Sequence, residues 1–262
     1  MPETLFLAER RRVIMEQLKR EGRVSVKDLS SLLNVSAVTI RQDLRSLEEE
    51  GVLERTHGGA VLPQAKPSGP ELSFDIRLRS KTSEKDAIAR AASELVQSGM
   101  SIALDASTTA FAMLPYLKQH ERLIVVTNSL IVAQGLLDSP QITVLMPAGR
   151  LRRDSIALVG NPETLPEINL NLGFFGVRGI SLVTGFTDTD LDEVTIKRAM
   201  MNRCLHNVII ADGEKWDKVA AYQLAEINQV HTIVTTPGYA THSITPFREQ
   251  GIRVISVTSD TD

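Results

Sequence analysis

Short apolar runs alternate with segments of helical spacing from about residue 73 onward. The runs are rich in β-branched residues and lack the polar–apolar alternation of strands with one face in water. Strands buried on both faces belong to a mainly parallel sheet that helices cover, so the pattern predicts an α/β domain. The seven runs read MSIAL, LIVV, ITVLM, LGFFGV, NVIIA, HTIVT and IRVISV.

Residues 1–62 follow a different pattern, which predicts three helices. Gly22 and Gly51 are expected to end the first and third helices, and Asn34-Val35 fits a tight turn after the second. Ser25 and Ser36 are suited to cap the second and third helices, because serine hydroxyls accept from the first amides of a helix. The expected inward-facing residues are Val13, Ile14, Leu18, Val26, Leu29, Leu32, Leu33, Ala37, Ile40, Leu44 and Leu47.

Three further segments complete the predicted organisation. In VLERTHGGAVL, Gly58-Gly59 lies between two extended runs and can supply the positive φ of a tight hairpin turn. Residues 63–72, with three prolines and a glycine, have the composition of a linker. A helix is expected from Ser83 to Gly99. The sequence therefore predicts a small N-terminal domain (1–62), a linker (63–72) and a larger α/β domain (73–262).

The positive charge of the chain is concentrated in its first helices. The net charge is −3, yet residues 10–45 contain nine Lys/Arg against four Asp/Glu. Three helices with a tight turn and a following hairpin are typical of a winged helix-turn-helix, whose third helix enters the DNA major groove. A three-helix module with a solvated charged face is the alternative. The candidate DNA-binding residues are Ser25, Ser36, Val38, Thr39, Arg41, Gln42, Arg45, Arg55 and His57.

Each of these residue types has a defined contact in such a complex. Arg can bond guanine, Gln can bond adenine, and Thr can meet a thymine methyl group. Ser25 suits a phosphate contact at a helix start. Arg55 and His57 are expected on the wing, near phosphates or the adjacent minor groove. The late glutamates of the third helix are expected to lie away from the phosphates.

Polar and charged residues follow five of the predicted strands. In an open α/β sheet, ligands bind outside the carboxyl ends of the strands, and hydroxyls with amides at a helix start suit a phosphate. Ordinary loop chemistry is the alternative, since loops favour such residues. No Gly-x-Gly-x-x-Gly follows a strand and no Walker A loop is present. The candidate effector-binding residues are Asp105, Ser107, Thr108, Thr109, Asn128, Gly149, Arg152, Arg178 and Lys215.

The chain resembles DeoR-type bacterial transcription regulators. Arg10, Ile14 and Leu18, followed by SAVTIRQDL at 36–44 and RTHGGAV on the wing, match the family signature. Further matches are SEKDAIARAA, LDASTT, VTNSL, LVG and KRAM, so the resemblance covers about residues 8–256. It implies a ribose-5-phosphate-isomerase-like C-terminal domain that binds phosphorylated sugars or their relatives. It also implies a structural role for Asp43.

The chain departs from the family pattern at three places. It has Ala148-Gly149 where the family often has Gly-Gly, GVRGI where it often has GADGI, and Asp212-Gly213-Glu214-Lys215 where it usually has Asp-Ser-Ser-Lys. The cation at Arg178 suggests an effector with a second anionic group. A pair between Arg178 and Glu214 is the alternative.

These features together predict a DNA-binding repressor of a carbohydrate-utilisation operon, with a phosphorylated sugar or related anion as effector. A homodimer or homotetramer is expected from the symmetry of operators and from the family. The alternative is a sugar-phosphate-isomerase-like enzyme with a nucleic-acid-binding appendage. Isomerisation needs a general base, and no acid stands between Phe174 and Val183.

The sequence carries no sign of a metal, a cofactor or a membrane partner. The histidines do not pair with Cys or carboxylates at metal-ligand spacing, and the single cysteine, Cys204, rules out an intrachain disulfide. No apolar run approaches the ~20 residues that span a bilayer, and the N-terminus lacks a signal-peptide pattern. A cytoplasmic protein, associated with the bacterial nucleoid when bound to DNA, is expected.

Overall fold

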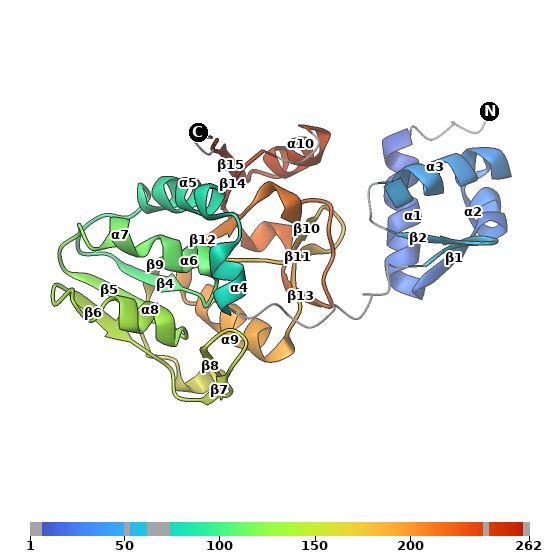
Figure 1. The fold of residues 1–262 in the computed structure, drawn as a ribbon. Coiled ribbons are helices and arrows are strands. Elements are labelled where there is room, and N and C mark those ends of the chain that lie inside the picture. The colour runs from blue at the N-terminus through green and yellow to red at the C-terminus, as the bar shows by residue number, and fades with distance from the viewer. Residues whose placement is uncertain (1–6, 50–52, 62–73, 238–240, 259–262) are drawn as a thin grey trace.

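The computed structural model describes residues 7–49, 53–61, 74–237 and 241–258. The predicted linker (63–72) and Gly51 lie outside these ranges. The N-terminal region is built from the helices α1 (Leu7–Glu21), α2 (Val26–Leu33) and α3 (Ala37–Glu49) and the strands β1 (Arg23–Ser25), β2 (Glu54–Thr56) and β3 (Gly59–Val61) (Figure 1).

The predicted signals for the N-terminal helices are largely confirmed. The Ser25 hydroxyl accepts from the Asp28 amide at 3.0 Å, and the Ser36 hydroxyl accepts from the Thr39 amide at 3.1 Å. Asn34 follows α2 in the left-handed conformation, with φ of 51°. Leu32 was expected to face inward, but 56% of it is exposed, because it lies one residue off the face that carries the buried Leu29 and Leu33.

The wing has a third strand that the sequence pattern did not predict. β1 pairs antiparallel with β3, which also pairs antiparallel with β2. Thr56 pairs with Gly59, so the turn is formed by His57 and Gly58, and neither Gly58 nor Gly59 has a positive φ. The predicted reason for the Gly-Gly pair is therefore wrong. Gly59 is required because a Cβ there would lie 1.8 Å from the carbonyl oxygen of Val24 on β1.

An ion pair joins the first and third helices. The guanidinium of Arg10 contacts the carboxylate of Asp43 through Nε at 2.5 Å and Nη2 at 3.0 Å, and Asp43 is buried. Such a two-point contact fixes both the distance and the rotation of α3 relative to α1. Asp43 thus holds α3 in place from its inward side, in keeping with the structural role that the family resemblance implied.

The seven apolar runs form one parallel sheet in the described part of the chain, with strand order β15-β14-β12-β9-β4-β5-β6. This confirms the predicted α/β fold. The strands are β4 (Ser101–Leu104), β5 (Leu123–Thr127), β6 (Ile142–Leu145), β9 (Leu170–Phe175), β12 (Cys204–Ala211), β14 (Thr232–Thr235) and β15 (Arg253–Ser256).

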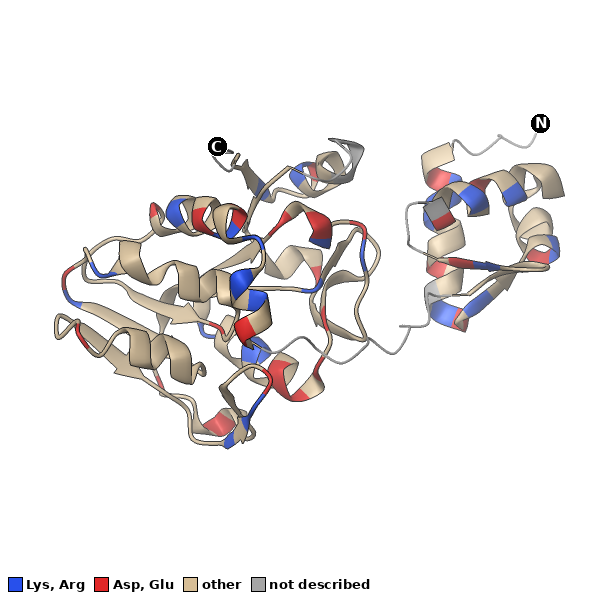
Figure 2. Ribbon diagram, in the orientation of Figure 1, with Lys and Arg blue, Asp and Glu red and all other residues tan. Residues whose placement is uncertain are grey.

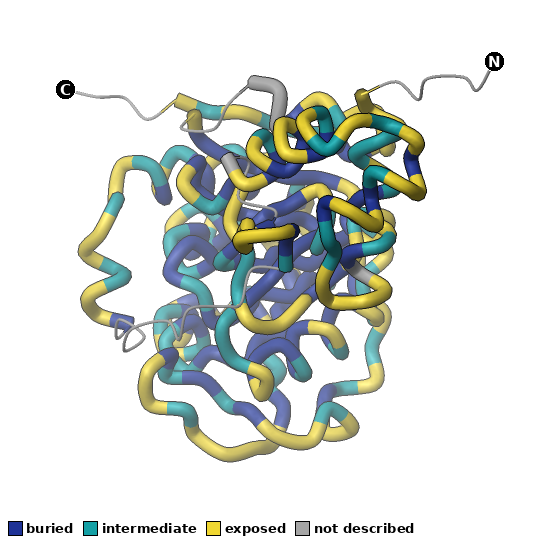
Figure 3. Tube along the Cα trace, turned by 90° about the vertical axis from the view of Figure 1, so that its right-hand side faces the viewer, coloured by how far each residue is buried: buried dark blue, intermediate teal, exposed yellow. Residues whose placement is uncertain are grey.

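Helices cover both faces of this sheet (Figure 1). On one face the core contains Ile102 and Leu104 with side chains of α5 to α8, and on the other it contains Ala103 with side chains of α9 and α10. Buried positions therefore concentrate in and beside the sheet (Figure 3). The helices are α4 (Phe74–Arg79), α5 (Thr82–Ser93), α6 (Thr108–Ala112), α7 (Leu114–Leu117), α8 (Leu130–Gly135), α9 (Leu191–Met201) and α10 (Thr241–Glu249).

Two smaller sheets were not predicted. β7 (Arg150–Arg152) pairs with β8 (Ala157–Val159), and β11 (Gly185–Asp188) pairs with both β10 (Gly179–Ser181) and β13 (Tyr222–Ala225), all antiparallel. Short 3₁₀ turns complete the domain: η1 (Pro162–Thr164), η2 (Gly213–Lys215) and η3 (Ile227–Gln229).

The predicted helix from Ser83 to Gly99 is shorter than expected. α5 ends at Ser93, six residues before Gly99, and the separate helix α4 precedes it. Among the described residues, no helix has both the length and the apolar character needed to cross a bilayer.

Gly59→Ala should destabilise the N-terminal domain, because the added methyl group collides with backbone rather than with a movable side chain. We expect the free energy of unfolding to fall by about 2–3 kcal/mol, measured by urea denaturation of the full chain. Gly58→Ala is the matched control, since a Cβ at Gly58 meets no atom within 4 Å. Equal stability of the two variants would contradict the close approach of β1 and β3.

Candidate functional site

The outward face of α3 carries the predicted base-reading residues. Val38 is 69% exposed, and Arg41, Gln42 and Arg45 are also exposed, while Ile40 and Leu44 fill the core. Lys and Arg residues recur along α1 and α3 (Figure 2). An exposed helix with cations, an amide and an apolar side chain on one face has the groups that read base edges in a major groove.

The hydroxyl groups of Ser25, Ser36 and Thr39 form hydrogen bonds within the protein. Ser25 accepts from the Asp28 amide and donates to the Asp28 carboxylate at 2.6 Å, which places a negative charge beside the predicted phosphate contact. The hydroxyls of Ser36 and Thr39 lie 2.9 Å apart in a hydrogen bond. Ser25 and Ser36 therefore cap helices. A hydroxyl that contacts DNA would have to do so while keeping its hydrogen bond within the protein.

The wing is tied to the end of α3. Arg55 lies 3.4 Å from Glu48 through Nε, and its backbone amide donates to the same carboxylate at 3.1 Å. One of the late glutamates of the third helix therefore contacts the wing rather than solvent alone. Arg41, Arg55 and the exposed His57 line one hollow between α3 and the wing, so the structure brings these three candidates together.

A cavity of about 250 Å³ lies at the carboxyl ends of β4, β9 and β12. The chain places β5 and β6 beyond β4 on one side, then returns to build β9, β12, β14 and β15 on the other. The cavity therefore lies at the point where the strand order reverses, which is where open α/β sheets bind ligands. Among the effector candidates, it is lined by Ser107, Thr108, Thr109, Arg178 and Lys215.

Asn128, Gly149 and Arg152 lie elsewhere, because the residues after β5 are hydrogen-bonded to β8 and the chain after β6 leads into β7. The buried Asn128 donates to the Leu158 carbonyl of β8 at 3.2 Å. A Cβ at Gly149 would lie 2.5 Å from the Val159 carbonyl oxygen, so glycine is needed there for backbone packing. Arg152 forms ion pairs with Glu193 at 3.0 Å and Asp190 at 3.1 Å, and Glu193 lies on the cavity wall.

Asp105 lies beneath the cavity and not on its wall. It is fully buried and accepts from the amides of Ser107 at 3.0 Å and Gly176 at 2.9 Å. Its carboxylate also lies 2.8 Å from Nζ of Lys197. Asp105 was expected to bind the effector, but it does not line the cavity, and both of its carboxylate oxygens are bonded within the protein.

Lys197 is the centre of a buried charge cluster. Its ammonium group is within 2.8 Å of Asp105 and 2.7 Å of Asp188, and donates to the Gly176 carbonyl at 2.9 Å. Burial disfavours this charge, but Asp105, Asp188 and Glu193 outweigh it and raise the pKa of Lys197. Burial likewise works against the Asp188 carboxylate, yet Lys197 holds its pKa below the usual value. Lys197 and Asp188 are therefore both charged at neutral pH.

Lys85 is a cation on the cavity wall that binds neutral partners. Its ammonium group donates to the carbonyls of Arg77 and Ser80, and no carboxylate among the described residues forms an ion pair with it. Burial lowers the pKa of Lys85 to about 8. A buried ammonium group that is held by carbonyl dipoles and opens onto a cavity favours an anionic ligand.

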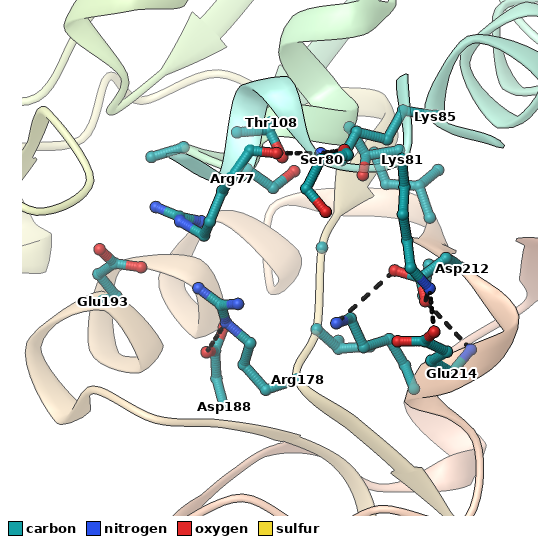
Figure 4. A pocket seen from close by; sticks show the side chains of 18 of the residues that line it. Arg77, Ser80, Lys81, Lys85, Thr108, Arg178, Asp188, Glu193, Asp212 and Glu214 are labelled. Carbon is teal, nitrogen blue, oxygen red and sulfur yellow. Dashed lines mark hydrogen bonds and ion pairs between the residues drawn. The ribbon is translucent and has the colours of Figure 1, made fainter. Parts of the chain in front are cut away.

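Arg178 and Glu214 have different partners, so the suggested pair between them is wrong. Arg178 lies 3.9 Å from Asp188 through Nε. Glu214 lies 2.7 Å from Nζ of Lys81, on the other side of the cavity (Figure 4). Both residues line the cavity wall.

Sequence reasoning missed the polar residues that the segments before β4 and after β10 contribute to the cavity wall. They come from α4, α5 and the residues between them, from the end of β11, and from α9, none of which was read as a strand end. A signal was present for some of them, because Lys85 and Lys197 occupy buried helical positions next to Ile88, Ala89 and Ile196. The missed residues are Arg77, Ser80, Lys81, Lys85, Asp188, Glu193 and Lys197.

The fold and the two sites define a DNA-binding regulator with an α/β sensor domain. Residues 10–66 match the DeoR-like helix-turn-helix domain, and residues 80–236 match the DeoR C-terminal sensor domain. The chain therefore belongs to the DeoR family of transcriptional regulators.

Curated relatives of similar length are named as repressors. The chain is 32% identical to a putative aga operon transcriptional repressor of Escherichia coli O157:H7, over 95% of this chain and 94% of that protein. It is 31% identical to the glycerol-3-phosphate regulon repressor of Escherichia coli (strain K12), over 87% and 90%. It is 32% identical to the HTH-type transcriptional repressor GlcR of Bacillus subtilis, over 88% and 89%. These names favour a regulator over an enzyme.

The chain also resembles solved structures of enzymes. One is ribose 5-phosphate isomerase A from Methanocaldococcus jannaschii, with 18% identity and a TM-score of 0.40 over 52% of this chain and 55% of that chain. At this score, the similarity carries no conclusion about a shared site or activity.

Proposed function

We propose that the protein represses a carbohydrate-utilisation operon and leaves its operator when a phosphorylated sugar or a related anion binds the cavity. The charge of the cavity wall is the observation that carries this proposal. Its described lining residues include six cations and four carboxylates. Asp105 beneath the wall pairs with Lys197, and Glu84 lies 3.9 Å from Lys81. Lys85, which is held by backbone carbonyls, is therefore the cation best placed to meet a phosphate monoester, which carries about −1.5 to −2 at neutral pH.

The names of the relatives support the same class of effector. The aga operon and the glycerol-3-phosphate regulon are the targets named for two relatives that match this chain over most of its length. Glycerol 3-phosphate is itself a phosphate monoester. The hydroxyls of Ser107 and Thr108 and the ammonium of Lys85 line one cavity, and these are groups that donate to phosphate oxygens.

We assign Arg41, Gln42 and Arg45 to base reading and Arg55 and His57 to the backbone or the adjacent groove. In a homodimer or homotetramer, two copies of α3 would read half-sites about one helical turn apart. The effector must bind the DNA-released state more tightly than the DNA-bound state, because equal affinity for both states would shift nothing. Release then follows from this difference in affinity.

An isomerase activity is disfavoured by the names of the relatives and by the contacts of Asp188 and Glu193, two of the four acids that line the cavity. Asp188 is held by Lys197 at 2.7 Å, and Glu193 is held by Arg152 at 3.0 Å. A general base has to reach the substrate proton, and both of these carboxylates are committed to internal cations. Turnover of ribose 5-phosphate by the purified protein would contradict this assignment.

Arg41→Ala should relax base discrimination at one operator position, at a cost of about 1–3 kcal/mol, because the lost guanidinium can no longer fork onto a base. Selection of binding sites from a random DNA pool, performed on wild type and variant, measures this. Arg248→Ala, an exposed arginine on α10, is the control and should keep the wild-type preference. An unchanged preference for Arg41→Ala would remove this residue from base reading.

The affinity for a phosphate monoester should fall as the pH rises from 7.5 to 9.5. The pKa of Lys85 is lowered to about 8, so its charge is present below that pH and lost above it, whereas the ester remains a dianion. We expect about a tenfold loss in wild type, measured by calorimetric titration with glycerol 3-phosphate. Lys85→Gln should bind weakly at both pH values.

Lys118→Gln is the control, because Lys118 pairs with Asp138 away from the cavity and its loss should leave the fall in affinity intact. If Lys85→Gln loses affinity with pH as steeply as wild type does, Lys85 does not pair with the anion.

A further inference from the structure

Lys81 on the cavity wall lies close to three carboxylates. Its Nζ lies 2.7 Å from Glu214, 3.2 Å from Asp212 and 3.9 Å from Glu84 (Figure 4). Lys81 immediately precedes α5, whereas Asp212 and Glu214 follow β12. These ion pairs therefore join the start of α5 to the 3₁₀ turn η2.

Two of these three carboxylates are fixed by other contacts. Asp212 is buried, caps η2 through the Glu214 amide at 3.0 Å, and also lies 3.6 Å from Lys215. Glu84 accepts from the Thr236 hydroxyl at 3.2 Å. Neither acid can leave its position without breaking these bonds.

Glu214 differs from both. Its side chain is 60% exposed, and within the described residues Lys81 is the partner that its carboxylate contacts. The hydrogen bond from Lys81 lowers the pKa of the Glu214 carboxyl, so it is ionised at neutral pH. An exposed side chain with one ion-pair partner costs little to move, since such pairs contribute about 0–1 kcal/mol. Glu214 is therefore the carboxylate that an incoming anion can displace from Lys81.

We propose that Glu214 is a built-in competitor, which occupies Lys81 in the empty cavity and is exchanged for an anionic group of the effector. This inference rests on the proposed function, because it assumes that the cavity binds an anion. Glu214 and an effector anion cannot both approach Lys81 closely without repelling each other. To bind, the effector anion must therefore interact with Lys81 more favourably than Glu214 does.

The exchange has a consequence for specificity. A phosphate dianion interacts with Lys81 more strongly than the single charge of Glu214 does, whereas a monoanionic sugar carboxylate offers no such advantage. Glu214 should therefore sharpen the preference for phosphorylated over carboxylated sugars. Its release from Lys81 also removes one of the ion pairs between α5 and η2.

Titration with glycerol 3-phosphate and with inorganic phosphate tests this exchange. The single tryptophan, Trp216, lies two residues after Glu214 and is buried, so its fluorescence can report occupancy, with calorimetry as a second measure. Glu214→Gln keeps the size of the side chain and removes its charge. We expect it to bind both compounds about two- to fivefold more tightly than wild type.

Glu94→Gln is the matched control, since Glu94 is an exposed glutamate that follows the C-terminal end of α5 and does not line the cavity. This variant should bind both phosphate compounds with the affinity of wild type. In the Lys81→Gln background, adding Glu214→Gln should give no gain, because the competitor then has no cation to occupy.

Each other outcome is decisive. If wild type and Glu214→Gln bind phosphate equally, the competitor role is wrong while the proposed function stands. If Glu214→Gln binds more weakly, Glu214 contacts the ligand directly and the exchange is again wrong. If neither protein binds either phosphate compound, the proposed anion site itself fails, and the exchange fails with it.

Discussion

The sensor domain depends on the buried ammonium group of Lys197. This group joins Asp105 after β4, the Gly176 carbonyl after β9, and Asp188 at the end of β11. Removing one partner of such a cluster would leave charges buried without compensation, which typically costs about 3–5 kcal/mol. The cluster therefore fixes the floor of the cavity, beneath the outer cations that face a ligand.

The layered architecture could be predicted from the sequence because buried parallel strands have a distinct composition. All seven apolar runs became strands of one sheet. The additional strands escaped because they are short and depend on tertiary contacts. β1 has three residues and forms only because Gly59 lets it approach β3, and β10 needs Gly179, where a Cβ would lie 2.3 Å from the Lys218 carbonyl oxygen. Neither contact has a local sequence signal.

The site could be predicted only in part, for a topological reason. Strand ends predicted the wall after β4, β9 and β12, but the same rule placed Asn128 and Arg152 in the cavity, although β5 and β6 lie beyond the point where the strand order reverses. That point depends on strand order, which the runs alone do not specify. The cations of the segment before β4, including Lys85, were missed because that segment was read as a covering helix.

Regulation requires that anion binding in the cavity weakens the contact between the N-terminal domain and DNA. Fluorescence anisotropy of a labelled fragment of the protein's own promoter, with glycerol 3-phosphate, ribose 5-phosphate and the matching unphosphorylated sugars added in turn, measures it directly. We expect at least one phosphorylated compound to release the DNA from wild type, its unphosphorylated form to leave the complex intact, and Lys85→Gln to stay bound in the presence of both. Release by the unphosphorylated sugar, or equal release from wild type and Lys85→Gln, would contradict this expectation.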